Sequence, residues 1–196
     1  MKILKKETGI YSLYLDKNNF INFCPSRGGI ITGWVFNNHQ ILYFDQKRFL
    51  DKSKSIRGGI PILFPICGNL ENKSLFGDNF LDLMQHGFAR DQEWNYGLNQ
   101  SKNILCLTLS DNEITRKYYP YLFELKIEIT LSFETLIFNI EILNKSKTIM
   151  PLNFGLHPYF NISNFNNIQF VDYSKCCLNQ KNNNLVKTEN LLRNSF

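Results

Sequence analysis

Residues 123–133 alternate between apolar and polar side chains without a break. The apolar positions, which share one face of an extended strand, are Phe123, Leu125, Ile127, Ile129, Leu131 and Phe133. A pairing register shifted by one residue would move this whole face into water. Each exposed side chain would then cost about 1.5–3 kcal/mol, and together they would exceed the roughly 5–15 kcal/mol that stabilises a typical domain. The segment therefore predicts a β-strand with one buried face.

Further strands are expected on both sides of this one. A tight turn at Glu134-Thr135 leads into a returning strand over residues 136–144, which makes an antiparallel hairpin. The other expected strands cover residues 9–15, 20–24, 30–36, 40–44 and 104–110, and the early ones are separated by residues typical of turns. Short strands without helical periodicity predict an all-β antiparallel sandwich. No internal boundary is apparent, so we expect one domain over residues 1–196.

Two regions depart from the strand pattern. Residues 57–91 are rich in glycine and proline, and Pro61 and Pro65 exclude a central strand there. A long irregular segment within a compact domain is usually functional. Beyond Phe170 the chain is polar and has no periodicity that would complete a core.

The composition indicates a globular protein, with 43% hydrophobic and 20% charged residues. No apolar run is long enough to span a bilayer, and the first residues lack the apolar segment of a signal peptide. We therefore expect a cytoplasmic protein without a membrane partner. The cysteines are odd in number and lack C-x-x-C spacing, which predicts reduced thiols at Cys24, Cys67, Cys106, Cys176 and Cys177.

The net charge is +5, but the basic residues are scattered along the chain. No basic run exceeds a pair such as Lys5-Lys6 or Arg116-Lys117. Binding to nucleic acid requires basic residues gathered on a face or in a run. The sequence therefore argues against a nucleic-acid partner.

The chain has three histidines, of which His39 lies in a predicted turn and is expected at the surface. His86 lies in the irregular region, and His157 precedes Pro158, which favours an extended backbone at the histidine. Each of these two, taken alone, is either a hydrogen-bonded structural histidine or part of a site. Neither has the spacing or neighbouring ligands of a metal motif, so no metal is expected.

Two arginines lie beside glycines in loops. Arg57 precedes Gly58-Gly59, and Arg90 closes the loop that contains Gly87, near the end of the irregular region. A guanidinium group on such a loop suits bidentate recognition of hydroxyl, carboxylate or phosphate groups. Taken alone, each arginine would more often be a solvated surface charge, and the combination is more specific than either one.

Three segments together carry a resemblance to a known family. They run from Ile56 to Pro65 (IRGGIPILFP), from Gln85 to Arg90 (QHGFAR) with Trp94, and from Phe154 to Phe160 (FGLHPYF). In order and spacing they resemble the aldose 1-epimerase (galactose mutarotase-like) family, in particular its hexose-6-phosphate mutarotase branch. The resemblance extends over nearly the whole chain.

The resemblance implies an antiparallel β-sandwich and interconversion of the α and β anomers of a hexose or hexose 6-phosphate. One group removes the proton of the anomeric hydroxyl while another protonates the ring oxygen, so no cofactor is expected. By position in the motifs, His157 matches the family's general acid, and histidine suits that role near neutral pH. Arg57, Gln85 and Arg90 match sugar- or phosphate-binding positions, and His86 matches a hydroxyl contact.

The sequence departs from the family after His157. The family's general base is a glutamate in a late strand, whereas this chain has only Asp172 and Glu189 beyond His157, neither in a similar motif. The resemblance thus covers the N-terminal two-thirds of the family domain and predicts a C-terminally truncated chain. Two alternatives to catalysis remain: a carbohydrate-binding pseudoenzyme, or a truncated remnant without function.

Overall fold

The computed structural model describes residues 2–6, 8–70, 82–99, 104–164, 174–179, 182 and 184–188. The chain divides into two compact units, Met1–Asn161 and Ile162–Phe196. The first unit contains both large sheets and every residue predicted to form the site. The single-domain organisation stays a prediction.

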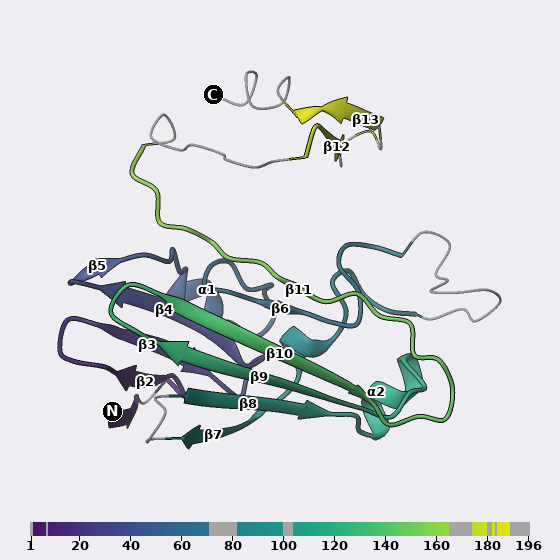
Figure 1. Cartoon of the computed structure of the whole chain (residues 1–196), viewed down its shortest axis with the longest axis horizontal. Coiled ribbons are helices and arrows are strands. Elements are labelled where there is room, and N and C mark those ends of the chain that lie inside the picture. Colours follow the sequence, from purple (N-terminus) through teal and green to yellow (C-terminus); the bar gives the residue numbers. More distant parts are fainter. Residues whose placement is uncertain are drawn as a thin grey trace. The chain divides into compact units, whose positions relative to one another are not determined.

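Two antiparallel sheets make up most of the first unit (Figure 1). One contains, in spatial order, β1 (Lys2–Lys5), β2 (Tyr11–Tyr14), β3 (Phe20–Cys24), β4 (Ile30–Phe36) and β5 (His39–Gln40). The other contains β10 (Leu136–Asn144), β9 (Phe123–Leu131), β8 (Ile104–Ser110) and β7 (Asn95–Asn99). The predicted all-β antiparallel fold is confirmed.

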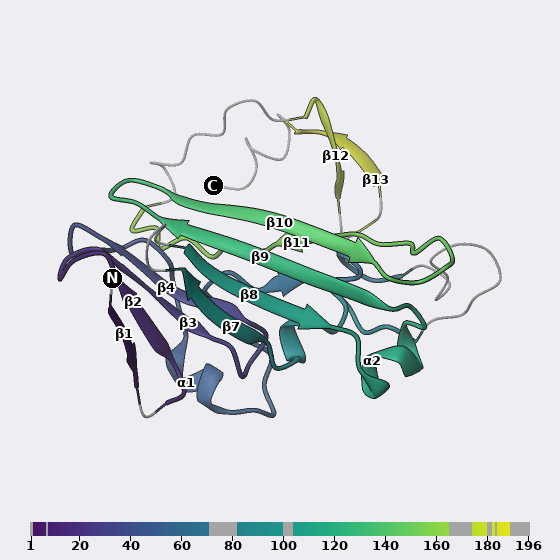
Figure 2. The ribbon, with the colours of Figure 1, turned by 60° about the horizontal axis from the view of Figure 1, so that its bottom comes forward.

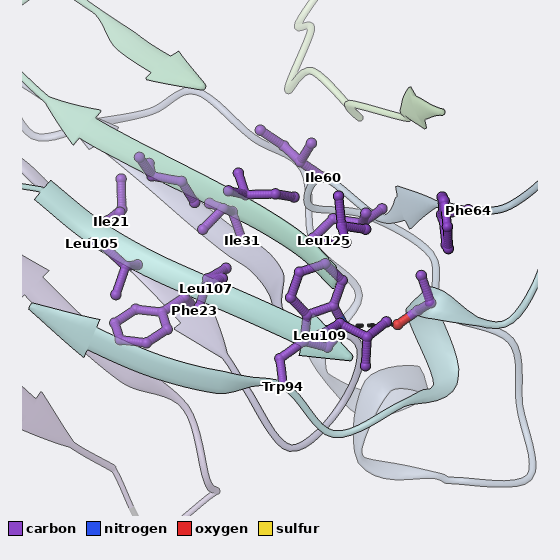
Figure 3. Close-up of a cluster of buried hydrophobic side chains, with 14 of the residues drawn as sticks. Ile21, Phe23, Ile31, Ile60, Phe64, Trp94, Leu105, Leu107, Leu109 and Leu125 are labelled. Atoms are coloured by element: carbon purple, nitrogen blue, oxygen red, sulfur yellow. Dashed lines mark hydrogen bonds between the residues drawn. The ribbon is translucent and has the colours of Figure 1, made fainter. Parts of the chain in front are cut away.

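The sheets enclose a common apolar core (Figure 2). Alternation along β9 buries Leu125, Ile127 and Ile129 completely, as their spacing predicted. They share one buried cluster with side chains of the other sheet, which include Leu13, Ile21, Phe23 and Ile31. Figure 3 shows part of this cluster, including Trp94, whose indole Nε1–H donates to the Ala89 carbonyl over 2.9 Å.

The predicted strand ends are accurate in four strands and wrong in others. The ranges 20–24, 30–36, 104–110 and 136–144 match β3, β4, β8 and β10. The long strand, however, ends at Leu131, because Ser132 and Thr135 form the hydrogen bonds of the hairpin turn. Phe133 lies within that turn and is 60% exposed, so its predicted burial is wrong.

The first and fourth predicted strands are shorter than expected. The range 9–15 contains only β2, and in the range 40–44 only Gln40 belongs to a strand, β5. Leu42 and Phe44 instead form isolated bridges, to Phe160 and Gly58 respectively. These bridges tie the chain to the segments that carry the candidate site.

Two short helices escaped the sequence analysis because neither is long enough to show an apolar stripe. In α1 (Gln46–Leu50) the Asp45 carboxylate accepts the first-turn amide of Arg48. In α2 (Glu113–Tyr118) Asn112 and Thr115 form a capping box, which satisfies amides that have no partner within the helix. None of the helices in the described part of the chain has the length and apolar character needed to cross a membrane.

The second unit contains a hairpin of β12 (Cys176–Asn179) and β13 (Asn184–Lys187), paired antiparallel. The sequence analysis predicted no strand in this polar region. All five cysteines are free thiols, as predicted.

Candidate functional site

A short ladder brings two distant motifs together. Strand β6 (Ile62–Leu63) pairs antiparallel with β11 (Gly155–Leu156), and Figure 1 shows the two side by side. Beyond the ladder, the His157 amide donates to the Pro61 carbonyl over 3.0 Å, and the Tyr159 amide donates to Gly59 over 2.9 Å. Since residues 157 and 159 are held in extended backbone, their side chains project from the same side of this segment.

The Gln85–Arg90 motif is attached to the end of β6. Gly87 forms a parallel bridge with Phe64, and the amides of Phe88 and Ala89 both donate to the Phe64 carbonyl. Gly87 has φ of +71°, and a Cβ at this position would lie 2.2 Å from the Phe64 oxygen. Only glycine fits such a contact with such a backbone. The 3-10 helix η2 (Ala89–Asp91) follows and carries Arg90.

These three segments line a hollow of about 290 Å³. Its lining comprises Ser55, Ile56, Arg57, Pro61, Leu63, Gln85, His86, Arg90, His157 and Tyr159. The five residues singled out in the sequence, Arg57, Gln85, His86, Arg90 and His157, therefore all lie around one space. The sequence analysis missed Tyr159, although its place two residues after His157 in an extended segment could have indicated it.

A backbone hydrogen bond fixes which ring nitrogen of neutral His86 carries the proton. The Gly68 amide donates to His86 Nδ1 over 2.9 Å, so Nδ1 is an acceptor and the ring proton belongs on Nε2. Burial lowers the pKa of His86, and the positive charges of Arg90 and His157 lower that pKa further. The lowered pKa favours the neutral imidazole, in which Nε2–H is the donor available to a ligand. Its backbone φ is +69°, an unusual value for a residue with a side chain.

His157 contacts two aromatic rings of the hollow, those of His86 and Tyr159. Its imidazole stacks on the Tyr159 ring, with centroids 4.8 Å apart and an interplanar angle of 28°. The His86 ring approaches His157 edge-on at 6.1 Å. His157 is exposed, so a molecule in the hollow can reach its imidazole.

The two arginines differ in how they are held. Arg90 donates to the Gln85 carbonyl over 2.8 Å, and its Nε lies 3.6 Å from the Asp91 carboxylate. The Arg57 carbonyl accepts the Asp45 amide over 3.0 Å, while its guanidinium has no hydrogen-bond partner among the described residues. One guanidinium is therefore oriented in advance and the other is available to a ligand.

Within the described part of the chain, no aspartate or glutamate lines the hollow. Asp172 and Glu189, the two carboxylates after His157, lie outside the described residues. Among the described residues there is also no group of three or more His, Cys, Asp or Glu side chains that could hold a metal ion. The hollow offers two imidazoles and two guanidiniums, and so suits an oxygen-rich ligand that accepts hydrogen bonds and protons.

Comparison with known proteins identifies the family. Residues 12–196 match the family profile described as aldose 1-epimerase. The chain belongs to the aldose 1-epimerase family. The sequence resemblance is therefore confirmed at the level of the family.

Solved structures of similar proteins support the same fold. The Slr1438 protein from Synechocystis sp. PCC 6803 is 36% identical, with a TM-score of 0.86 that covers 96% of this chain and 67% of that one. A galactose mutarotase related enzyme from Lactobacillus acidophilus is 26% identical, with a TM-score of 0.65 over 82% of this chain and 51% of that one. The galactose mutarotase-like fold predicted from the sequence is confirmed.

Among curated proteins, a provisionally named glucose-6-phosphate 1-epimerase from Cenchrus ciliaris is 29% identical over 154 residues. The match covers 72% of this aldose 1-epimerase family chain and 44% of the relative. The matched region thus spans less than half the length of that relative.

Proposed function

We propose that this chain binds a hexose or hexose 6-phosphate in the hollow around His157 and promotes the interconversion of its α and β anomers. The observation that supports this most directly is the gathering of Arg57, Gln85, His86, Arg90 and His157 around one space of about 290 Å³. A hollow of this volume is at the lower limit of ordinary small-molecule sites.

His157 is the proposed general acid. It gives its proton to the ring oxygen as the C1–O5 bond breaks. The anomeric hydroxyl becomes the aldehyde oxygen and gives its proton to water, since no carboxylate lines the described hollow. Rotation about C1–C2 and the reverse proton transfers then close the ring on the other face. Stacking on Tyr159 restricts the imidazole to one orientation, which favours transfer to a fixed acceptor.

His86 is the proposed contact to a sugar hydroxyl. With Nδ1 occupied by the Gly68 amide, its Nε2–H donates and cannot remove a proton. This separates the roles of the two histidines: one exchanges a proton and the other holds the substrate.

Arg57 and Arg90 are the proposed phosphate contacts, with Gln85 beside them. Two guanidiniums with no carboxylate in the described lining suit a dianionic group better than a neutral sugar. The name of the Cenchrus ciliaris relative, glucose-6-phosphate 1-epimerase, points in the same direction.

Exchange spectroscopy on α-glucose 6-phosphate tests the proposed activity, with the rate of anomer exchange compared between the chain and a His157→Ala variant. General acid assistance typically contributes about 10²–10⁴-fold. We expect the variant to fall to the uncatalysed rate and the parent chain to exceed it. Equal rates for both proteins, at the uncatalysed value, would overturn the proposal of catalysis.

A second candidate is sugar binding without turnover. It is favoured by one observation, the lack of an aspartate or glutamate lining the described hollow. Calorimetry separates the two functions, because saturable binding of glucose 6-phosphate without exchange supports binding alone. Loss of each arginine contact to a phosphate should weaken binding about tenfold or more, so Arg57→Gln and Arg90→Gln test the orientation of the ligand.

A further inference from the structure

A second hollow, of about 240 Å³, lies on the face of the β1–β5 sheet opposite the core. Ser12 and Asn22 pair across β2 and β3, and they alternate with the core residues Leu13, Ile21 and Phe23. The hollow shares no lining residue with the one around His157. An inference about this hollow therefore stands apart from the proposed function.

A β-bulge turns the side chain of Thr32 toward this hollow. In the pairing of β3 with β4, Asn22 faces Gly33 and Phe23 faces Ile31, so Thr32 is the extra residue. Its side chain lines the hollow and is only 3% exposed. Its hydroxyl has no hydrogen-bond partner among the residues the structure describes. Burying such a hydroxyl without a partner is unfavourable, and bulges often re-aim a side chain for a function.

The amide groups of Asn22 and Gln40 line the same hollow, and their hydrogen-bond partners fix their orientation. Asn22 Oδ1 accepts from Ser12 Oγ over 2.6 Å and from Lys6 Nζ over 3.5 Å. Because an ammonium group only donates, the atom facing Lys6 must be oxygen and the Asn22 nitrogen points elsewhere. Gln40 Nε2 donates to the Leu42 carbonyl over 2.9 Å, and a carbonyl only accepts, so this amide is fixed too.

Gly33 shows where the two nitrogens meet. A Cβ at this position would lie 3.0 Å from Asn22 Nδ2 and 3.2 Å from Gln40 Nε2. The two amide nitrogens therefore pack closely over Gly33 and bring two N–H donors together. Lys6 adds a positive charge at the rim, and no aspartate or glutamate lines the hollow within the described part of the chain.

We propose that this hollow is a binding site for a small oxyanion, a phosphate or a carboxylate group, held by the donors of Asn22, Thr32, Gln40 and Lys6. Each of the four supplies an N–H or O–H group, and an anion would give the Thr32 hydroxyl its acceptor. Hydrogen bonds from neutral donors to a charged acceptor are stronger than those between neutral groups. An anion oxygen would lie in the hollow, within reach of the two amide nitrogens.

Titration with inorganic phosphate, followed by backbone amide NMR, tests the proposal in an Arg57→Gln/Arg90→Gln background that removes the arginines of the other hollow. We expect saturable shifts of the Thr32 and Gly33 amides. Gly33→Ala should abolish them, because the added methyl group would lie 3.0 Å from Asn22 Nδ2 and 3.2 Å from Gln40 Nε2 and would displace both donors. Thr32→Val, which keeps the shape and removes the hydroxyl, should weaken binding about tenfold.

Gly97→Ala provides the matched control, since a Cβ at Gly97 meets nothing within 4 Å. It should leave phosphate binding unchanged, and a cooperative thermal transition in each variant excludes loss of folding as the cause. A parallel titration with acetate separates the two anion classes, and a response to either supports the site. No saturable shift with both anions, or equal affinity in the parent, Gly33→Ala and Thr32→Val proteins, would overturn the proposal.

Discussion

The backbone amide of Gly68 donates a hydrogen bond to Nδ1 of His86, with 2.9 Å between the two nitrogens. The bond is reciprocated, because the His86 amide donates to the Gly68 carbonyl over 2.8 Å. The pair fixes both the backbone of His86, in its left-handed conformation, and the position of its ring proton.

His86→Asn should separate the structural role of His86 from its contact with the ligand. An asparagine oxygen takes the place of Nδ1 and can accept the Gly68 amide, and asparagine tolerates a φ of +69°. The Nε2 donor is lost. We expect a melting temperature close to that of the parent, with about fivefold or greater weakening of glucose 6-phosphate binding by calorimetry. Unchanged binding would show that Nε2 does not contact the ligand.

The free energy of unfolding should depend on pH through His86. The pKa of this imidazole is lowered from its ordinary value of 6.5, chiefly by burial. The unfolded chain therefore takes up this proton at a higher pH than the folded chain, so stability rises with pH in that range. The contribution is fully present above about pH 6.5 and is lost as the pH falls through the lowered pKa.

Urea unfolding of the parent and of His86→Asn between about pH 8 and about pH 5 isolates this contribution. The parent should lose more stability than the variant on acidification. Parallel pH profiles for the two proteins would contradict the expected direction.

Tyr159→Leu should disturb the proposed acid without removing it. The stacked ring holds the His157 imidazole, and aromatic pairs contribute about 0.5–1.5 kcal/mol. We expect up to about a tenfold fall in anomer exchange rate, with a smaller change in substrate affinity. Tyr159→Phe, which keeps the ring, is the matched control and should retain the parent rate.

Phe123→Ala and Phe133→Ala form a pair that tests where β9 ends. Phe123 is fully buried, so Phe123→Ala should lower the free energy of unfolding by about 3–5 kcal/mol. Phe133 is 60% exposed in the turn and should change the free energy of unfolding by less than about 0.5 kcal/mol. Chemical denaturation measures the free energy of unfolding of both variants. A large loss in Phe133→Ala would indicate that the strand extends to Phe133.

Gly87→Ala should destabilise the Gln85–Arg90 motif. The new methyl group would meet the Phe64 carbonyl at 2.2 Å on a backbone with φ of +71°. We expect a loss of more than about 1 kcal/mol in unfolding free energy. Gly97→Ala, where a Cβ has open space around it, should be nearly neutral in the same assay. A comparable loss at both positions would argue against the close contact.

The strands were predictable from the sequence because burial of one face imposes an alternation that survives in the residue order. Leu125, Ile127 and Ile129 show this most clearly, and all three are buried. The end of the strand was less predictable. Hydrogen bonds between Ser132 and Thr135 close the turn, and an apolar residue between them, Phe133, is indistinguishable in sequence from the last residue of the strand.

The site was predictable in its members and not in its geometry. The three motifs indicated His86, His157 and Arg57, and these residues lie around one hollow. The bond from Gly68 joins residues eighteen positions apart through a backbone amide, which leaves no mark on residue type. The roles assigned to these residues stay predictions until the variants are measured.

The ladder between β6 and β11 involves only two residues from each strand. It nevertheless joins segments about a hundred residues apart, and closing so long a loop carries a large entropic cost. The hollow around His157 thus exists only in molecules in which this pairing has formed. A ligand that binds there would select molecules that have completed folding and would raise their population by mass action. Glucose 6-phosphate added during refolding is therefore expected to increase the yield of native protein.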